Sequence, residues 1–327
     1  EGSLLVANEV MRNRSQILAE NLIKWGHPEV VVTNNDPADF TDLTHLFDVI
    51  LTDVPCSGEG MFRKDQVAVD EWSLENVDIC WKRQRRILAD IWPALKPGGI
   101  LIYSTCTFNR EEDEDNVAWI AKELDADILN VPVEDSWGIT GNLTGKDFPV
   151  YRFLPHKTKG EGFFLGVLKK RGDVLDETPR RFLKTSARLD KKKKGKDAKQ
   201  PLVVPKEAKT WLEDSSEYAL AMKDTNVVAF PKAYENEYAL LQQTLKVIHA
   251  GITLGEIKGK DLIPHHSLAM STALAKEAFP RAEVTYEQAI AYLRKEGLIL
   301  DADVPRGYVL LTYKDVPLGF AKNIGNR

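Results

Sequence analysis

The chain has 327 residues, of which 43% are hydrophobic and 28% are charged, and its formal net charge is −5. This composition indicates a globular chain of two or three domains, and it excludes a uniformly basic nucleic-acid binder. No stretch approaches the ~18 apolar residues of a membrane span, and no signal peptide is recognisable, although the first residue is not methionine. We therefore expect a cytoplasmic monomer without membrane contacts, in which any RNA contact comes from local basic patches.

Two apolar runs near the N-terminus predict strands followed by acidic residues. Residues 4–7 lead to Glu9, and residues 30–33 lead to Asp36. The spacing of three large apolar residues predicts a helix between them: Leu18, Leu22 and Trp25. An acid just after a strand of a nucleotide-binding sheet can hold ribose hydroxyls, whereas the Asn-Asn-Asp-Pro turn at Asp36 needs no ligand to explain it.

A central stretch has the pattern of a βαβ unit. Its first β-rich run, residues 47–52, ends at Asp53-Val54-Pro55-Cys56, and its second, residues 100–103, ends at Ser104-Thr105-Cys106-Thr107. The apolar face of a helix is predicted between them: Ile87, Leu88, Ile91, Trp92 and Leu95. Because the carboxyl ends of parallel strands line one crevice, Asp53, Cys56 and Cys106 should converge there.

The two turn cysteines could form a disulfide, share a metal, fill core space or act as nucleophiles. Zinc usually takes close pairs of Cys or His, and neither cysteine has such a neighbour, so no metal site is expected. A disulfide would be unusual in a cytosolic enzyme. Core packing is the better interpretation for Cys80, which is flanked by Ile79 and Trp81. Cys56 and Cys106 instead lie in turns that present side chains.

A charged and aromatic loop follows the first cysteine turn. It contains Met61-Phe62-Arg63-Lys64-Asp65 and then Glu71-Trp72. Arg63 and Lys64 suit the phosphates of an RNA whose base has left its stack, or they could pair with Asp65 and Asp70 at the surface.

Further elements follow Cys106. Asn109 with Glu112 predicts the N-cap of a helix, and three apolar runs complete the sheet: residues 126–131, 150–153 and 162–168. Phe163 and Phe164 in the last run are assigned to the core.

A basic segment separates this part of the chain from the rest. Residues 180–199 contain ten Lys or Arg and two acidic residues, which is typical of a solvated linker. Its Lys191, Lys192 and Lys193 could also contact RNA phosphates. Beyond it, short apolar runs predict smaller α+β units. Strands are expected at residues 218–221, 227–230, 308–313 and 317–322, and helices at residues 240–248 and from Ser267 and Tyr286. The pair His265-His266 is interpreted as a helix cap region, since adjacent His residues seldom bind one metal ion.

Both cysteine turns resemble those of a known family. Pro55-Cys56-Ser57-Gly58-Glu59-Gly60 and Ser104-Thr105-Cys106-Thr107 resemble the two signature turns of the Sun-type RNA 5-methylcytosine methyltransferases. The whole chain is similar to the bacterial RsmF branch of that family, which modifies small-subunit ribosomal RNA. The resemblance implies an α/β fold in four segments: a Rossmann-like methyltransferase domain at residues 1–171, a basic linker at 172–205, a first C-terminal domain at 206–258 and a PUA-like RNA-binding domain at 259–327.

The resemblance also implies roles for individual residues. Cys106 would attack carbon 6 of cytosine, Cys56 would serve the later elimination, and Asp53 would hold the cytosine edge. The cofactor would be S-adenosylmethionine, with its ribose on Glu9 and its adenine side near Asp36. Arg14 and Asp53 complete the expected cofactor set.

One family feature is missing from the sequence. The glycine-rich cofactor loop and the first strand would lie before Glu1, so the sheet is expected to be incomplete at its N-terminus. Two alternatives remain open: a DNA cytosine-5 methyltransferase in which Cys56 attacks, and a non-catalytic RNA-binding or ribosome-assembly protein with a methyltransferase-like fold. The Thr-Cys-Thr turn counts against the first alternative, and the intact thiols count against the second. The expected partner is ribosomal RNA within the small ribosomal subunit.

Overall fold

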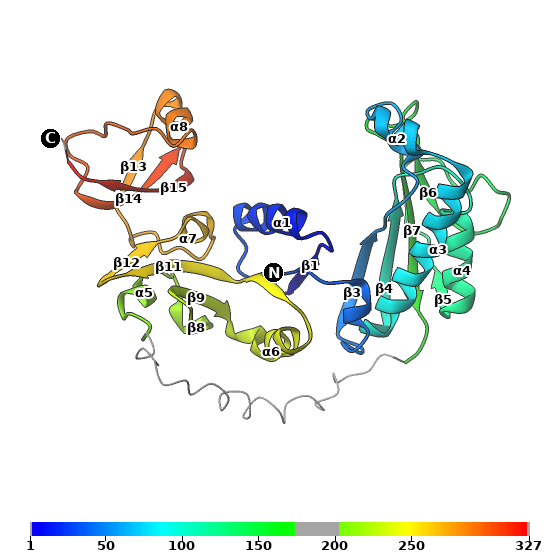
Figure 1. Cartoon of the computed structure of the whole chain (residues 1–327), viewed down its shortest axis with the longest axis horizontal. Coiled ribbons are helices and arrows are strands. Elements are labelled where there is room, and N and C mark those ends of the chain that lie inside the picture. Colours follow the sequence, from blue (N-terminus) through cyan, green and yellow to red (C-terminus); the bar gives the residue numbers. More distant parts are fainter. Residues whose placement is uncertain (1, 174–202, 326–327) are drawn as a thin grey trace. The chain divides into compact units, whose positions relative to one another are not determined.

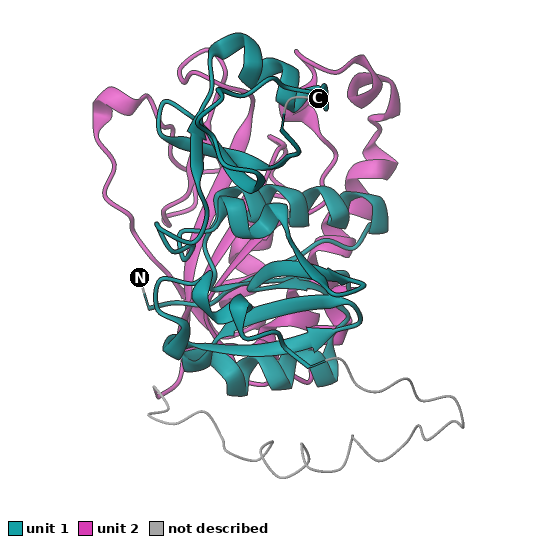
Figure 2. Cartoon of the chain, turned by 90° about the vertical axis from the view of Figure 1, so that its left-hand side faces the viewer, with its two compact units in different colours: residues 1–35, 183–327 teal, residues 36–182 magenta. Residues whose placement is uncertain are grey.

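The computed structural model describes residues 2–173 and 203–325, and the chain is drawn in Figure 1. It contains two compact units: unit 1 comprises Glu1–Asn35 and Leu183–Arg327, and unit 2 comprises Asp36–Phe182 (Figure 2). The predicted RNA contacts Lys191, Lys192 and Lys193 lie outside the described residues. None of the helices in the described ranges is both long and apolar enough to cross a membrane.

Unit 2 is built on a five-stranded sheet with the order β3-β4-β7-β5, in which β6 also pairs with β7. Its strands are β3 (Phe47–Asp53), β4 (Leu95–Thr105), β5 (Ala126–Ile128), β6 (Tyr151–Phe153) and β7 (Phe163–Lys170). Its helices are α2 (Gln66–Glu71), α3 (Leu74–Ile91) and α4 (Glu114–Glu123), with short 3-10 turns at η1 (Pro37–Phe40), η2 (Glu59–Met61), η3 (Trp92–Ala94) and η4 (Asp135–Trp137). β3 and β4 are parallel, with Val49 opposite Ile100 and Asp53 opposite Ser104. Because α3 connects these two strands, the predicted βαβ unit is confirmed.

Helix α3 begins at a capping serine, buries one face and ends before a proline. The Ser73 hydroxyl caps it by accepting from the Asn76 backbone N–H at 3.0 Å. Its buried side chains recur at helical spacing: Val77, Cys80, Gln84, Leu88 and Ile91. The prediction that Trp92 and Leu95 continue this helix was wrong. Pro93 has no backbone N–H to extend the ladder, so a 3-10 turn intervenes and Leu95 begins β4.

The core of unit 2 lies between the sheet and its helices. Its fully buried large side chains come from α3, α4, β4 and β7: Leu88, Leu101, Tyr103, Ile120, Phe164 and Leu168. The Tyr103 and Phe164 rings meet edge to face with centroids 6.4 Å apart. Phe164 and Cys80 are therefore core residues, as predicted. β3 is the edge strand of this sheet, and its Val49 and Leu51 are 54% and 65% exposed.

The helix after Cys106 begins later than predicted. α4 starts at Glu114 rather than just after Asn109. Asn109 and Glu112 do exchange two hydrogen bonds. The Glu112 N–H donates to the Asn109 side chain at 2.9 Å, and the Asn109 side-chain amide donates to the Glu112 carboxylate at 2.7 Å. This exchange closes a turn that precedes the helix, so the N-cap prediction for Asn109 was wrong.

The N-terminal part of unit 1 forms a three-stranded sheet, β1-β2-β10. β1 (Leu5–Asn8) and β2 (Val30–Thr33) are parallel, and β10 (Val247–Ala250) is antiparallel to β2. β2 is central, and all four of its residues are buried. Helix α1 (Arg12–Trp25) packs on this sheet through Ala19 and ends at Gly26, whose φ of 81° is the left-handed conformation favoured at a helix C-terminus. Trp25 was predicted to lie on the apolar face, but it is 74% exposed, so that prediction was wrong.

The remainder of unit 1 contains two smaller sheets. They have the orders β12-β11-β9-β8 and β13-β14-β15. Their strands are β8 (Tyr218–Lys223), β9 (Asn226–Pro231), β11 (Ile252–Lys258), β12 (Asp261–Pro264), β13 (Arg281–Glu283), β14 (Gly307–Tyr313) and β15 (Val316–Asn323). The helices are α5 (Glu207–Thr210), α6 (Glu235–Thr244), α7 (His266–Met270) and α8 (Tyr286–Leu293), with 3-10 turns at η7 (Ser215–Glu217) and η8 (Lys232–Tyr234).

These elements match the predicted α/β fold followed by smaller α+β parts, with one exception. Ile248 was assigned to a helix but lies in β10, because α6 ends at Thr244. The predicted domain limits stay a prediction. Residues 1–35 group with the C-terminal strands because the backbone of β2 pairs with β10.

Truncating a core side chain of α3 tests the packing of unit 2. Leu88→Ala should lower the free energy of unfolding by about 2–5 kcal/mol, since the fully buried site would become a cavity. Urea denaturation followed by circular dichroism measures the loss. Ile79→Ala is the matched control, because Ile79 is on the same helix but 47% exposed, and its loss should stay below about 1 kcal/mol. Equal losses in the two variants would contradict this packing.

Candidate active site

The structure brings the two turn cysteines into contact. Cys56 follows β3 and Cys106 follows β4, and these neighbouring parallel strands end side by side. The Cys56 and Cys106 sulfur atoms are 2.9 Å apart, and the Cys106 backbone N–H donates to the Cys56 sulfur at 3.3 Å. Both thiols are free and half-buried. Two nucleophilic groups thus share one position at the carboxyl end of the sheet.

Their contact makes the two thiols unequal acids. The hydrogen bond from the Cys56 thiol lowers the pKa of Cys106. The same contact, together with burial, raises the pKa of Cys56. The two thiols therefore titrate as one pair, in which the second proton is held between the two sulfurs. Cys80 differs from both, because burial raises its pKa to about 11.

Asp53 lies at the end of β3, opposite Ser104 of β4, and its side chain is exposed. Its negative charge opposes ionisation of Cys106, because it acts to raise the pKa of that thiol. Asp53 is therefore near enough to interact electrostatically with Cys106, and its exposed carboxylate is accessible to a ligand. Asp53 was expected at this end of the sheet, and its role toward a base stays a prediction.

A buried carboxylate ties the two cysteine turns together. Glu112 is fully buried and accepts from the Ser57 backbone N–H at 3.0 Å. It also accepts from the side-chain amides of Gln84 and Asn109, each at 2.7 Å. The hydroxyls of Ser57 and Thr107, one beside each cysteine, are 2.9 Å apart. The residues that follow both cysteines are thus fixed by one buried polar cluster.

Gln84 extends this cluster into α3 and the sheet. Its amide N–H donates to the Pro55 carbonyl at 2.9 Å, directly before Cys56. Its oxygen accepts from the Tyr103 hydroxyl at 3.0 Å and from the Asn116 amide at 2.7 Å. Since every polar group here has a partner, the cluster is rigid as well as buried.

A second buried cluster holds the backbone after Cys106. Thr105 donates to the Asp113 carboxylate at 2.7 Å, and Arg152 forms ion pairs with Asp113 and Glu114. Arg152 also donates to the Phe108 carbonyl at 3.0 Å. Burial raises the pKa of Asp113, and the nearby Arg152 guanidinium opposes that rise. The loop between Cys106 and α4 is therefore anchored from both sides.

The remaining acids predicted as cofactor ligands belong to different units. In unit 1, Glu9 follows β1, accepts from the Met11 N–H at 2.9 Å and pairs with Arg14 at 3.2 Å. In unit 2, Asp36 is exposed and accepts from the Ala38 N–H at 3.1 Å, which lowers the pKa of Asp36, with Arg86 assisting. The contacts of Asp36 are thus those of a turn, and its carboxylate is still exposed to solvent.

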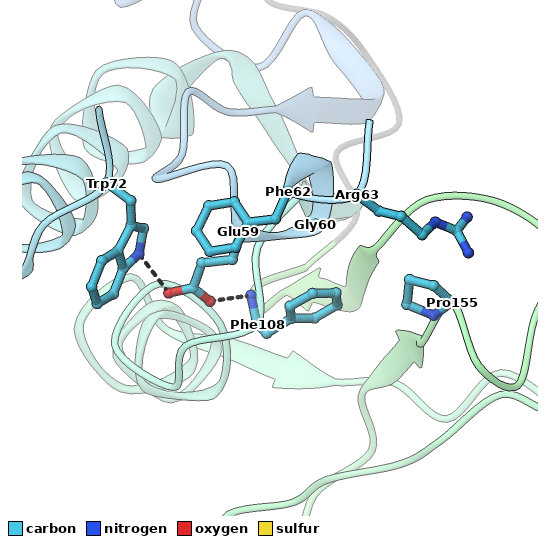
Figure 3. Close-up of a pocket in the computed structure, with 7 residues that line it drawn as sticks. All are labelled: Glu59, Gly60, Phe62, Arg63, Trp72, Phe108 and Pro155. Atoms are coloured by element: carbon cyan, nitrogen blue, oxygen red, sulfur yellow. Dashed lines mark hydrogen bonds between the residues drawn. The ribbon is translucent and has the colours of Figure 1, made fainter. Parts of the chain in front are cut away.

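The loop after Gly60 borders a cavity of about 380 Å³ (Figure 3). The cavity is lined by Glu59, Gly60, Phe62, Arg63, Trp72, Phe108 and Pro155. Arg63 donates to the Gly160 carbonyl at 2.9 Å and pairs with Glu161. The alternative pairing of Arg63 with Asp65 or Asp70 is not what the structure contains, since Asp65 caps α2 and Asp70 accepts from Gln66. Lys64 is exposed next to it.

Sequence reasoning missed the residues that hold the two turns. Ser57, Gln84 and Glu112 were not recognised as part of the site, and Asn109 was assigned to a helix cap. The available signal was the Asn-x-x-Glu spacing directly after the second cysteine turn. Its meaning depends on a partner in the first turn, because Glu112 bonds to Ser57, which is 55 positions away.

No metal site accompanies the thiols in residues 2–173 or 203–325, where no group of three or more His, Cys, Asp and Glu side chains could hold an ion. His265 caps α7, because its ring nitrogen accepts from the Ser267 N–H at 3.0 Å.

The fold and site define an α/β protein with two adjacent thiols at the ends of neighbouring parallel strands. Residues 1–169 match the family model described as 16S rRNA methyltransferase RsmB/F. The chain belongs to this family. Residues 279–327 match the model described as the methyltransferase RsmF PUA domain.

Named relatives extend along the whole chain. It is 31% identical to ribosomal RNA small subunit methyltransferase F of Klebsiella pneumoniae (strain 342), covering 99% of this chain and 66% of that protein. It is 32% identical to the protein of the same name from Citrobacter koseri, covering 100% and 66%. The chain thus spans about two thirds of the length of these relatives. A solved structure titled NSun6 from Pyrococcus horikoshii with SFG is 28% identical, with a TM-score of 0.45 over 52% of this chain and 42% of that one.

The unequal acidity of the thiols can be measured by alkylation. Iodoacetamide reacts with thiolates, so Cys106 should be modified at a lower pH than Cys80, whose pKa is raised to about 11. Mass spectrometry of the peptides across a pH series measures each site. Cys56→Ala removes the hydrogen bond to Cys106 and should move its profile to higher pH, while Cys80→Ala should leave it in place. An unchanged Cys106 profile in Cys56→Ala would contradict the shared proton.

The buried carboxylate cluster predicts a stability loss. In Glu112→Gln an amide N–H₂ replaces one acceptor oxygen and faces N–H donors, so the free energy of unfolding should fall by about 2 kcal/mol. Urea denaturation measures the change. Glu111→Gln is the control, because the neighbouring Glu111 is exposed and should change little. A Glu112→Gln protein as stable as the control would show that the cluster does not depend on the carboxylate.

Proposed function

We propose that this chain is the catalytic part of an S-adenosylmethionine-dependent methyltransferase that modifies carbon 5 of a cytosine in small-subunit ribosomal RNA. The observation that carries the proposal is the contact between the Cys56 and Cys106 sulfurs, with the lower pKa on Cys106. Family membership and the names of the relatives support the substrate class. Carbon 5 of cytosine is a weak nucleophile, so the reaction needs a group that activates the ring.

Cys106 is the proposed nucleophile. Its thiolate adds to carbon 6, and the electron pair of the 5,6 double bond moves to make carbon 5 nucleophilic. The contact with Cys56 lowers the pKa of Cys106 and so favours its thiolate form. The rigid Glu112 cluster holds both turns so that the sulfur is already in place.

Asp53 is proposed to hold the edge of the cytosine. Its exposed carboxylate at the end of β3 can share a proton with the base, which stabilises the charge that develops on the ring during addition.

Cys56 is proposed to serve elimination. When Cys106 is bonded to carbon 6 as a thioether it carries no negative charge, so the main cause of the raised Cys56 pKa disappears. Cys56 can then release its proton to solvent and accept the proton from carbon 5. The carbon 5 electrons restore the double bond, the carbon 6 to sulfur bond breaks, and Cys106 leaves as a thiolate.

S-adenosylmethionine would supply an electrophilic methyl group when bound. Glu9, Asp36 and Asp53 are the proposed carboxylates, because each stands at or after a strand end, a position from which a carboxylate can accept from a ribose hydroxyl. Arg14, which pairs with Glu9, would orient that carboxylate.

The RNA contacts are proposed to be spread over the chain. Arg63 and Lys64 would contact phosphates near the reacting base, and Lys191, Lys192 and Lys193 would add salt-sensitive contacts. The match of residues 279–327 to a PUA domain supports an RNA-binding C-terminal part within the predicted limits 259–327. We also propose residues 1–171 as the methyltransferase domain, and a cytoplasmic monomer that acts on the small ribosomal subunit.

The division of labour between the thiols can be tested directly. In the full-length protein, Cys56→Ala should accumulate a covalent RNA adduct with small ribosomal subunits and S-adenosylmethionine, because addition proceeds and elimination stalls. A denaturing gel shows the adduct as a slowly migrating protein–RNA band. The band should be absent from the Cys56→Ala/Cys106→Ala protein and should persist in Cys56→Ala/Cys80→Ala.

Two outcomes would contradict the proposal. A band from Cys106→Ala but not from Cys56→Ala would make Cys56 the nucleophile, as in a DNA cytosine-5 methyltransferase. No band from any variant that still binds the cofactor and RNA would favour a non-catalytic RNA-binding protein.

A further inference from the structure

We propose that the aromatic cavity beside the cysteine turns binds a second, unpaired nucleobase of the RNA, adjacent to the base that reacts. The cavity is the one lined by Glu59, Gly60, Phe62, Arg63, Trp72, Phe108 and Pro155 (Figure 3). The inference rests on the proposed function, which supplies the base that reacts. The geometry and chemistry of the cavity indicate that it binds a second base.

The lining of the cavity suits a flat, aromatic ligand. Phe62, Trp72 and Phe108 place three rings around about 380 Å³ of space, which is within the range of small-ligand pockets. The Phe62 and Trp72 rings are edge to face, with centroids 6.4 Å apart. Phe62 is 38% exposed and Trp72 is 36% exposed, so ring surface is available to a partner. Unpaired bases of RNA are commonly held by stacking on such side chains.

The cavity wall is rigid before any ligand arrives. The Glu59 carboxylate accepts from the Trp72 indole N–H and the Phe108 backbone N–H, each at 2.9 Å (Figure 3). It also accepts from the Asn109 amide at 3.2 Å. These three donors hold the Trp72 ring and the Phe108 backbone, and they offset the negative charge of Glu59. A ligand therefore meets ordered aromatic surface, and little binding energy is lost in ordering side chains.

The cavity is connected to Cys106 through the backbone, but Cys106 does not line it. The Gly60 backbone N–H donates to the Cys106 carbonyl at 2.9 Å, and Phe108 lies two residues after Cys106. Neither Cys56 nor Cys106 lines the cavity. A base held here is therefore close to the thiols in the fold without being the base that they attack, which indicates a neighbouring nucleotide.

The charge at the cavity rim fits a nucleotide rather than an apolar ligand. The Arg63 side chain lines the cavity, is 58% exposed, and bonds to Gly160 and Glu161. Lys64 is exposed beside it. A cation at the edge of an aromatic pocket can meet the phosphate of a nucleotide whose base enters the pocket.

The test compares RNA binding by variants of Trp72. Fluorescence anisotropy with the labelled single-stranded ribosomal RNA segment that contains the target base measures affinity. Trp72→Ala should weaken binding about tenfold, because a stacking partner is lost, and Phe62→Ala should act in the same direction. Trp72→Phe keeps a ring but loses the bond to Glu59, and should stay within about twofold of the unmodified protein. Trp137→Ala is the matched control, since Trp137 is 52% exposed in the same unit but outside the cavity lining.

Abasic substitution identifies the bound nucleotide. Removing the base next to the target should weaken binding by the unmodified protein about tenfold, and should cost Trp72→Ala little further affinity, because the two changes remove the same contact. The dependence on salt should be unchanged in Trp72→Ala and shallower in Arg63→Ala.

Three results would overturn the inference. Trp72→Ala could bind RNA as tightly as Trp137→Ala. Trp72→Phe could bind RNA as weakly as Trp72→Ala, which would show that the bond to Glu59 holds the loop and that stacking plays no part. Weakened binding of S-adenosylhomocysteine by Trp72→Ala, with unchanged RNA affinity, would assign the cavity to the cofactor.

The covalent band tests the proposed function, and the RNA affinity of the Trp72 variants tests the base pocket. A covalent band from Cys56→Ala together with RNA affinity that is insensitive to Trp72 would leave the reaction standing and remove the base pocket. RNA affinity that depends on Trp72, without any covalent band, would leave a base-binding pocket on a non-catalytic protein.

Discussion

The buried Glu112 carboxylate is the constraint on which the candidate site depends. It accepts from the Ser57 backbone and from the side chains of Gln84 and Asn109, and so joins the first cysteine turn to α3 and to the second turn. A carboxylate without partners in such a position would cost several kcal/mol. Because each donor is itself bonded into the fold, the carboxylate is retained and the two cysteine turns cannot separate.

The same arrangement governs the chemistry of the thiols. Parallel pairing of β3 with β4 brings Cys56 and Cys106 to one edge, and the fixed turns hold their sulfurs at 2.9 Å. At that separation two thiolates would repel each other, so the pair keeps one proton. The packing of the turns therefore makes the two thiols titrate together and gives them unequal pKa values. Rigid backbone and unequal acidity are two results of one set of contacts.

Much of the fold could be predicted from local patterns. β2 and β3 match their apolar runs, and the βαβ unit follows from a helical pattern between two strands. The failures concern residues at or beyond the ends of helices and one distant strand pairing. Leu95 continues the helical spacing of α3 but enters β4 after Pro93, and Trp25 has helical spacing yet faces solvent. β2 pairs with β10, a partner more than 200 positions away that periodicity could not indicate.

The residue pattern was sufficient to indicate two thiols and an acid just past strand ends, because strand hydrophobicity and Pro-Gly turn chemistry are local properties of the chain. Tertiary structure alone decided how those groups act. The ionisation of Cys106 depends on a sulfur 50 positions away, and the role of Glu112 depends on a backbone N–H 55 positions away. Glu59 likewise joins two parts of the aromatic cavity through its bonds to Trp72 and Phe108. Contacts of this kind are made in space, and the spacing of residues along the chain does not encode their distances.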